Sequence, residues 1–465
     1  MTRVSLILAV VILMVWALPA YAVNGILEIH DGQQVLHVWG TNYEMGYAHG
    51  YLLADQIMAM MRVYAFPPPD AGTALYEAAR LFVLNNFAFE EDLTNEAQGL
   101  YDGMLDAGIP TYVDVLQRDF DVDDVLTYIG LADLNSLFCA TVIGWNTTTV
   151  NDGTLNGLLA ATHNTDYVRE REDPWLAARC SVLLAMTPSD PNQQPFLSLT
   201  LAGMPGIIAG INEQGIGLYL NKGRVDVPYE ELNLDPLPEP GPWLTRKALA
   251  LRDFDGDEIN TIEDVFAFFE EENHFSSSMY QVFGPTERSD PPAGVLEINN
   301  KERTVAYPDD DPTLTDCMVT LNWEDKLSGV PTGNYAAIRY NHSRELINET
   351  YGGDLLLTNM WDFLHEMQLH IPLFPTMQSM ILIPDLMRLA IAFSDETGTA
   401  PNHDPVWHDI EDLFLTPAVD DDTAPDDDVV DDDTDDDTTP DDDDDDDNDQ
   451  ADDDDDDNDD GCGCS

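Results

Sequence analysis

Phe138-Cys-Ala-Thr-Val-Ile-Gly-Trp-Asn146 and Thr162-His-Asn-Thr-Asp-Tyr167 are the two segments that decide the fold, and a turn signal separates them. Their β-branched and aromatic residues favour strands. Asn151-Asp152-Gly153 favours a hairpin turn, because such turns need positive φ angles that Asn and Gly adopt at little cost. A hairpin centred there would place Cys139 opposite Asp166. The pattern therefore predicts a thiol, a carboxylate and the imidazole of His163 at one end of a two-stranded ribbon.

Cys139 has two interpretations at this point. Free cysteines are among the most often buried residues, so Cys139 is either a plain core residue or a reactive thiol. The chain has five cysteines, which is an odd number and too few for a disulfide framework in a body of this size. We expect Cys180 and Cys317 to pair with each other, which would leave Cys139 free.

The first 22 residues have the pattern of a secretory signal peptide. Arg3 is followed by an apolar run from Val4 to Leu18, and Ala20-Tyr-Ala22 fits a small-x-small cleavage site. The run is too short for a membrane anchor, and no later apolar run reaches spanning length. We therefore predict an exported protein that is secreted, periplasmic or displayed on the cell surface, and that is not an integral membrane protein after signal removal.

The chain is strongly acidic. Its formal net charge is −70, and removing the 28 aspartates between positions 420 and 460 from that total still leaves −42. Such a surface repels nucleic acids and anionic lipids, so neither is an expected partner. Residues 416–465 cannot bury apolar area and are predicted to form a disordered tail. Cys462 and Cys464 at its end suggest cell-surface attachment, a metal clip or an intermolecular disulfide.

The sequence between these ends divides into a helical N-terminal segment, 23–138, and a strand-rich core, 139–415. Alternating apolar residues in 24–39 indicate an edge hairpin. Thr41 and Glu44 have the spacing of a capping box for the helix that follows. Gly46 and Gly50 in this helix lie on one face and would permit close helix packing, and we interpret His49 as a core residue.

Further elements are expected throughout the body. Helices are predicted within 72–135, 243–269, 335–349 and 355–370, and strands at 181–186, 196–201, 207–211, 216–220, 280–284, 295–298, 304–307, 319–322, 377–383 and 389–393. Asp253, Asp255 and Asp257 alternate as in a calcium loop, but the glycine comes fourth rather than sixth. A solvated acidic loop that caps a helix is the favoured interpretation, with a structural calcium ion as the alternative. No other cofactor is expected.

Five stretches together resemble the family typified by isopenicillin-N acyltransferase, one of the N-terminal nucleophile hydrolases, over about residues 25–400. The stretches are Gly40-Thr-Asn-Tyr-Glu-Met-Gly-Tyr-Ala-His-Gly50; Cys139-Ala-Thr141 with Asp152-Gly153 and His163-Asn-Thr-Asp-Tyr167; Gly203-Met-Pro-Gly206 with Gly210-Ile-Asn-Glu-Gln-Gly-Ile-Gly217 and Asn221; Val319-Thr-Leu-Asn322 with Arg339-Tyr340; and Thr376-Met-Gln-Ser-Met-Ile381. Their common order and spacing favour a nucleophilic Cys139.

The resemblance implies an α+β fold, a four-layer αββα sandwich of two sheets between helical layers. It also implies that the precursor cleaves itself before Cys139. The α-amine freed in this way has a reference pKa of about 7.7–8.0, so it is a usable base near neutral pH. One residue would then supply both the nucleophile and its base. The thiolate would attack an amide or ester carbonyl, and water or an amine would resolve the acyl-enzyme.

The resemblance also implies roles for other residues. Asp166 would hold the α-amine, Asn221 would donate to the oxyanion, and Asn322 would orient the nucleophile or the substrate. Each has a structural alternative, which is turn capping for Asp166 and strand-end capping for the two asparagines. Arg339 would bring positive charge to the site or would pair with a surface carboxylate.

Two positions depart from the family pattern. Phe138 stands where many members have a small residue, which bears on self-cleavage. His163 stands where relatives often carry Arg, and because imidazole titrates near neutrality, activity is predicted to depend on pH there. The sequence thus predicts an exported, self-processing cysteine amidohydrolase or acyltransferase whose substrate is an N-acyl amino acid, a lactam or a small peptide. The alternative is a surface-displayed binding protein on a degenerate form of the same fold.

Overall fold

The computed structural model describes residues 23–66, 73–134, 138–167, 173–224, 226–329, 335–369 and 374–414. The predicted signal peptide and the acidic tail with Cys462 and Cys464 lie outside these residues. The described residues all belong to one unit, which ends at Thr416. Within them, every helix is too short or too polar to cross a membrane.

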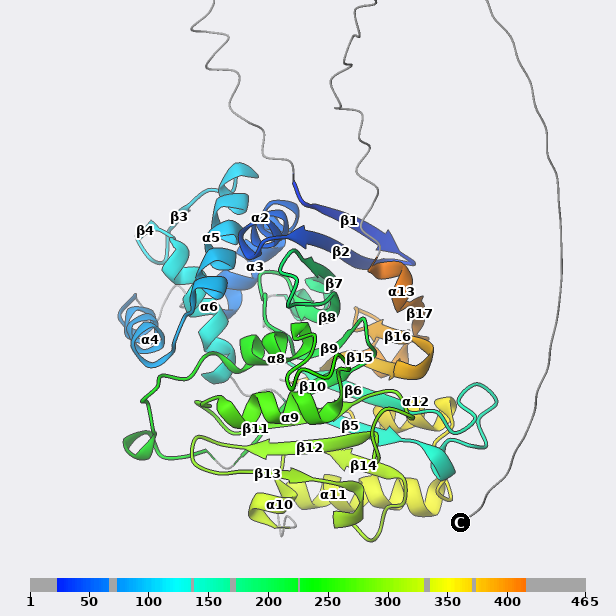
Figure 1. Cartoon of the computed structure of the whole chain (residues 1–465). Coiled ribbons are helices and arrows are strands. Elements are labelled where there is room, and N and C mark those ends of the chain that lie inside the picture. Colours follow the sequence, from blue (N-terminus) through cyan, green and yellow to red (C-terminus); the bar gives the residue numbers. More distant parts are fainter. Residues whose placement is uncertain are drawn as a thin grey trace, which may run out of the picture. The chain divides into compact units, whose positions relative to one another are not determined.

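In the described part of the chain, a large sheet contains nine strands (Figure 1). Their spatial order is β1 (Gly25–His30), β2 (Gln33–Gly40), β7 (Ser181–Pro188), β8 (Phe196–Leu201), β9 (Ala209–Asn212), β10 (Gly217–Lys222), β11 (Ser278–Phe283), β12 (Ala293–Ile298) and β13 (Arg303–Ala306). All neighbours are antiparallel except β2 and β7, which are parallel. β1 and β2 form the predicted edge hairpin, so the segment before Cys139 contributes two strands to this sheet.

A second sheet of six strands carries Cys139. Its spatial order is β14 (Cys317–Thr320), β5 (Phe138–Gly144), β6 (Ala160–Asp166), β15 (Thr376–Ile383), β16 (Arg388–Phe393) and β17 (Val406–Asp409). β17 was not expected from the sequence. A short pair outside both sheets joins β3 (Tyr112–Val113) to β4 (Arg118–Asp119).

Helices pack against both sheets. They are α2 (Asn42–Leu52), α3 (Ala54–Tyr64), α4 (Thr73–Asn86), α5 (Glu91–Asp106), α6 (Val122–Leu134), α7 (Leu176–Arg179), α8 (Gly241–Ala250), α9 (Ile262–Glu271), α10 (Asp325–Ser328), α11 (Tyr335–Glu345), α12 (Leu357–Glu366) and α13 (Ile410–Leu413). A π-helical turn, Leu346–Thr350, continues α11. α2, α3, α5, α6, α8 and α9 share one apolar core with the large sheet, whereas α12 and the π-helical turn share another with the six-stranded sheet.

Strand alternation explains how two sheets can stack between these helices. In β7, Val182 and Leu184 face the helices, whereas Leu183 and Ala185 enter a third core between the sheets. In β5, Val142 faces the helices of the six-stranded sheet, and Ile143 faces the large sheet. Because successive strand residues point to opposite faces, fully apolar strands can serve two cores at once. The predicted helix–sheet–sheet–helix layering is therefore observed.

The first helical layer follows local signals in the sequence. The Thr41 hydroxyl accepts a hydrogen bond from the Glu44 backbone N–H, and the Glu44 carboxylate accepts one from the Thr41 backbone N–H. These two bonds form the predicted capping box. A Cβ atom at Gly46 would lie 2.2 Å from the carbonyl oxygen of Glu96, and one at Gly50 would lie 2.0 Å from that of Leu100. Glycine at these positions lets α2 and α5 pack backbone against backbone.

The predicted hairpin register was wrong by one residue. Cys139 pairs with Thr165, and Asp166 pairs with Phe138. The connection is also not a tight turn at Asn151-Asp-Gly153, because β5 ends at Gly144 and β6 begins at Ala160, with a 3₁₀ turn at Asn146–Thr148. A shift of one residue moves a side chain to the other face of a sheet. Asp166 therefore lies on the helix-facing side, opposite to the side on which the Cys139 thiol lies.

The predicted disulfide was also wrong. Cys180 and Cys317 are both free, as is Cys139. Cys180 contributes to the core between the large sheet and its helices, whereas Cys317 contributes to the core on the outer side of the six-stranded sheet. Because two sheets separate these cores, no rearrangement of side chains alone would join the two sulfurs.

Candidate active site

Cys139 lies at the start of β5, on the face that looks toward the large sheet. Its side chain is fully buried against Ile208 and the half-buried ring of Tyr167. Its Sγ is 3.9 Å from the carbonyl oxygen of Leu220 in β10. The thiol is thus enclosed between the two sheets in the uncut chain, and no solvent reaches it.

Asn322 holds the backbone of Cys139. Its Oδ1 accepts from the Cys139 N–H at 2.8 Å, and its Nδ2 donates to the Lys222 carbonyl at 2.9 Å. Asn322 follows β14 by two residues, and its amide side chain bridges the end of β10 to the second residue of β5. The backbone nitrogen held in this way is the atom that would become the α-amine after cleavage before Cys139.

Asn221 is the neighbour of Lys222 at the end of β10. Its Nδ2 makes only long bonds, 3.4 Å to the Thr320 carbonyl and 3.5 Å to the Leu321 carbonyl. Its Oδ1 is buried without a hydrogen-bond partner in the described structure. A buried polar group in this state is costly and rare, and such groups often mark functional sites. The Nδ2 donor is weakly occupied and could turn to another acceptor.

Asp166 lies on the other side of the six-stranded sheet, where the charge of Arg339 acts on it. The Thr376 hydroxyl donates to Asp166 Oδ1, and the buried Arg339 in α11 donates from Nη2 to the Met367 carbonyl at 3.0 Å. Burial raises the pKa of Asp166 to about 7, although the positive charge of Arg339 and the hydrogen bond from Thr376 both lower it. Arg339 is therefore not a surface residue paired with a surface carboxylate.

Charges act on the Cys139 thiol from both faces of its sheet. Burial, and then the negative charge of Asp166, raises the pKa of the thiol, whereas Arg339, the Lys222 backbone N–H and Arg224 lower it. Burial is the largest of these effects, so the thiol is protonated in the uncut chain. Opening the site to water would remove that effect and leave both arginines in place, which would favour the thiolate.

His163 faces the large sheet from β6 but does not titrate as predicted. Its Nδ1 lies 3.1 Å from the Thr141 hydroxyl, and its ring lies 4.7 Å from that of Tyr219. Burial lowers the pKa of His163 to about 3, so it stays neutral through the physiological range. The predicted change of its charge near neutral pH is therefore wrong, because sequence spacing alone gave no measure of burial.

The favoured interpretation of His49 as a core residue is confirmed, since it is fully buried and accepts from the Gly203 N–H.

Arg224 and Lys222 were not expected from the sequence. The Arg224 guanidinium lies 4.5 Å from the centre of the Phe138 ring, which also meets the Phe374 ring edge-on. Lys222 and Arg224 line a cavity of about 370 Å³, whose other walls include the aromatic rings of Phe82, Tyr229 and Phe275. Composition could have pointed to these two residues. Lys and Arg total only 19 in the whole chain, and two of them follow Asn221 within three residues.

Asp253, Asp255 and Asp257 lie in a loop before α9. Their carboxylates accept backbone N–H groups of the same loop, such as Gly256 by Asp253 and Ile259 by Asp257. Asp264 completes a capping box with Thr261 at the start of α9. These contacts match the favoured interpretation of an acidic loop that leads into a capped helix, and calcium binding there stays a prediction.

Comparisons with known proteins give distant similarity only. No family model matches the chain. An uncharacterized protein of Archaeoglobus fulgidus is 21% identical over 213 residues, which is 42% of this chain and 34% of that protein, so the chain spans about a third of that relative's length.

Three solved structures are similar in part. A Caenorhabditis elegans N-acylethanolamine-hydrolyzing acid amidase ortholog covers 53% of this chain and 94% of its own at 16% identity and a TM-score of 0.39. A conjugated bile acid hydrolase mutant of Clostridium perfringens covers 59% of this chain and 94% of its own, at 12% identity and a TM-score of 0.37. Penicillin V acylase of Agrobacterium tumefaciens covers 55% of this chain and 83% of its own, at 9% identity and a TM-score of 0.33. Because all three TM-scores are low, the function proposed below rests on the contacts around Cys139.

Proposed function

We propose that this protein is an exported, self-processing amide hydrolase of the N-terminal nucleophile type, with Cys139 as nucleophile. The observation that carries the proposal is the hydrogen bond from the Cys139 backbone nitrogen to Asn322 Oδ1. This bond places an amide side chain on the atom that would become the α-amine. The weakly bonded Asn221 follows Leu220, whose carbonyl oxygen contacts Cys139 Sγ, and the charges of Arg339 and Arg224 act on the same thiol.

Self-processing would break the Phe138–Cys139 peptide bond. Sγ attacks the Phe138 carbonyl carbon, the C–N bond breaks, and the nitrogen of Cys139 takes up a proton as a thioester forms. Water then hydrolyses the thioester to a Phe138 carboxylate and a free thiol. The Phe138 ring is held between Arg224 and Phe374, and its backbone is paired with Asp166, so the bond is fixed in place before it is cut.

In turnover, the new α-amine would act as the base for its own thiol. Asn322 would keep this amine oriented, as it already holds the same nitrogen. Asp166, paired with Phe138 in the uncut chain, would lie beside the position that Phe138 leaves. Asn221 Nδ2 would donate to the oxyanion, which is the kind of contact whose loss typically slows a reaction about 10²–10³-fold. We favour hydrolysis over acyl transfer, because water is abundant outside the cell.

The substrate class follows from the cavity beside Lys222. It joins aromatic walls to the exposed Arg224 guanidinium, and its two carboxylates, Asp133 and Asp226, accept hydrogen bonds from the backbone of Gly241 and Ser277. Arginine binds carboxylates through two parallel hydrogen bonds. An N-acyl amino acid carries an apolar group, an amide and a carboxylate, and it matches this set better than a neutral amide does.

The decisive experiment is intact-mass analysis of the purified exported protein, followed by N-terminal sequencing. We expect two fragments, with the second beginning at Cys139 and no intact mature chain. Release of amines from N-acyl amino acids and from their neutral methyl amides would then be compared. Arg224→Ala should raise KM for the acids alone.

An intact chain that keeps Phe138 joined to Cys139 and hydrolyses no amide would overturn the proposal. The binding-protein alternative would then account for the same residues. Cleavage at a different bond would also overturn it, because the amine would be formed away from Asn322.

A further inference from the structure

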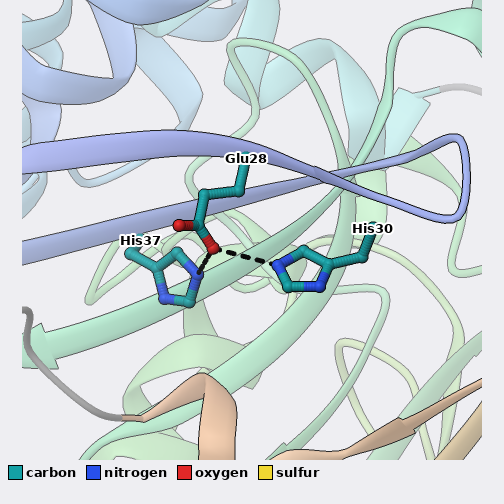
Figure 2. A group of neighbouring side chains, drawn as sticks. All are labelled: Glu28, His30 and His37. Atoms are coloured by element: carbon teal, nitrogen blue, oxygen red, sulfur yellow. Dashed lines mark hydrogen bonds and ion pairs between the residues drawn. The ribbon is translucent and has the colours of Figure 1, made fainter.

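We propose that Glu28, His30 and His37 form a binding site for a first-row divalent transition metal, with Zn²⁺ as the ion that its ligands fit best. The three side chains project from the β1–β2 hairpin at the edge of the large sheet (Figure 2). They lie outside the Cys139 site, so the proposal does not depend on the proposed hydrolase activity.

The register of the hairpin brings the three residues to one face. Ile26 pairs with His37, and Glu28 pairs with Val35. Directly paired residues of antiparallel strands lie on the same face, and so do residues two apart along one strand. Glu28 and His30 therefore share a face with His37, and Glu28 lies diagonally across from it.

The ligand atoms have the spacing of a small coordination sphere. Glu28 Oε2 lies 2.9 Å from His30 Nε2 and 3.6 Å from His37 Nε2, and all three atoms lie within 4.8 Å of one another. Bonds of about 2.0–2.1 Å to Zn²⁺ would place neighbouring ligands of a tetrahedron about 3.3 Å apart. The two measured distances lie on either side of that value. Figure 2 shows both imidazoles directed at the same carboxylate oxygen.

His37 has the outer hydrogen bond that a metal ligand needs. Its Nδ1 donates to the carbonyl oxygen of Leu413 in α13 at 3.1 Å. This bond fixes the tautomer and leaves the lone pair on Nε2, the atom that faces Glu28. Ligating histidines usually donate their second nitrogen in this way, which orients the ring and raises its basicity. The His37 side chain is only 11% exposed, so its orientation is set by the fold before any ion binds.

The set of donors selects the class of ion. Two imidazole nitrogens and one carboxylate suit zinc and its neighbours, whereas calcium and magnesium prefer oxygen ligands alone. His408 lies outside this group of ligand atoms, since its ring centroid is 6.2 Å from that of His30 and its Nε2 donates to Gln33 Oε1 at 2.8 Å. His30 and Glu28 are each about half exposed, so a fourth position would be open to water or to a ligand from solution. A bound ion would also join β1 to β2 across the edge of the sheet.

The test uses the full mature chain without a histidine tag, in a Cys462→Ser, Cys464→Ser background that removes the terminal thiols as competitors. Co²⁺ is titrated first, since a tetrahedral site gives intense visible absorption, and Zn²⁺ is then used to displace it. We expect one tight site, with affinity lowered at least about tenfold by His30→Ala or Glu28→Gln. Zn²⁺ should raise the Tm of the parent and not that of these variants.

His365→Ala is the matched control. His365, Asp362 and Glu366 on α12 form a second group of possible metal ligands. This group contains one imidazole, whereas the hairpin group contains two. Its replacement should leave the affinity unchanged. Glu28→Gln keeps the size of the side chain, and its Tm without metal reports whether the hairpin is intact. Equal affinity in the parent and in both hairpin variants would show an ion pair only and would overturn the proposal, as would a loss of affinity that is the same in His365→Ala.

Discussion

Cys139 and Cys317 are two buried thiols in neighbouring strands, and their surroundings differ. β5 and β14 are antiparallel, with Cys317 opposite Gly144. Cys317 is the first residue of β14 and Cys139 the second residue of β5, so the two lie at opposite ends of the pair. Burial is the largest cause that raises the pKa of both thiols. Cys317 faces the apolar core under α12, whereas Cys139 faces the large sheet, where Asn322 and the end of β10 meet it.

The difference teaches that burial alone does not distinguish a structural cysteine from the proposed nucleophile. What separates the two is the set of polar groups that each strand end gathers. Around Cys139 these are an amide that holds the backbone nitrogen, a second amide with weak bonds and two arginines from different elements. Around Cys317, one arginine, Arg344, acts against two carboxylates, Asp311 and Asp316, so the carboxylates outnumber the arginine.

The largest expected effect is on processing. Cys139→Ala should give a single uncut chain, because no other group can form the thioester, and Cys317→Ala should be cut like the parent. Intact-mass analysis of the two variants, purified in parallel, measures this directly. A cut Cys139→Ala chain would remove the distinction between the two cysteines.

The next effect is the pH dependence of stability at Asp166. Its folded pKa of about 7 lies above its ordinary value of 3.8, so the folded state holds the extra proton and loses stability as pH rises from about 4 to 7. In a Cys139→Ala background, Asp166→Asn should therefore gain up to about 4 kcal/mol relative to its parent between pH 4 and 8.

Urea unfolding at both pH values measures this gain, with Asp404→Asn as the control on an exposed carboxylate. Parallel stability curves for Asp166→Asn and its parent would show that burial does not perturb this group.

The effect expected on turnover is similar in free energy to the stability effect at Asp166, or smaller. Asn221→Ala should lower kcat about 10²–10³-fold, with little change in KM, because the lost donor would act on the oxyanion. Asn348→Ala should have no effect on turnover, since Asn348 is exposed and its Nδ2 donates to the Thr313 carbonyl rather than to any group proposed to act on the substrate. Equal rates in both variants would remove Asn221 from the proposed mechanism.

The smallest effect concerns Cys317 itself. Cys317→Ala removes one buried sulfur from the core under α12 and should destabilise the chain by about 1 kcal/mol, within the range of small core truncations. Urea unfolding measures it, in the Cys139→Ala background that keeps the chain whole. A loss of several kcal/mol would mean that Cys317 has polar contacts comparable to those of Cys139.

Many elements could be predicted because their causes are local. The strand at Phe196–Leu201 has the bounds expected from its sequence, and the capping box of α2 formed as its spacing predicted. The close approach of α2 and α5 followed from Gly46 and Gly50. The convergence of Cys139 with Asn322 was expected only through the family resemblance, since 182 residues lie between them and no local signal links them.

By itself, the sequence determined the alternation of the strands and the positions of most helices, because such a pattern needs only its own residues, whereas the layered fold was expected only through the family resemblance. Tertiary structure alone decided the one-residue register that separates Asp166 from the Cys139 thiol, the neutral state of His163 and the position of Arg224 over Phe138. These depend on which segments lie against one another, and burial changes the energy of a charge far more than any neighbour in sequence does.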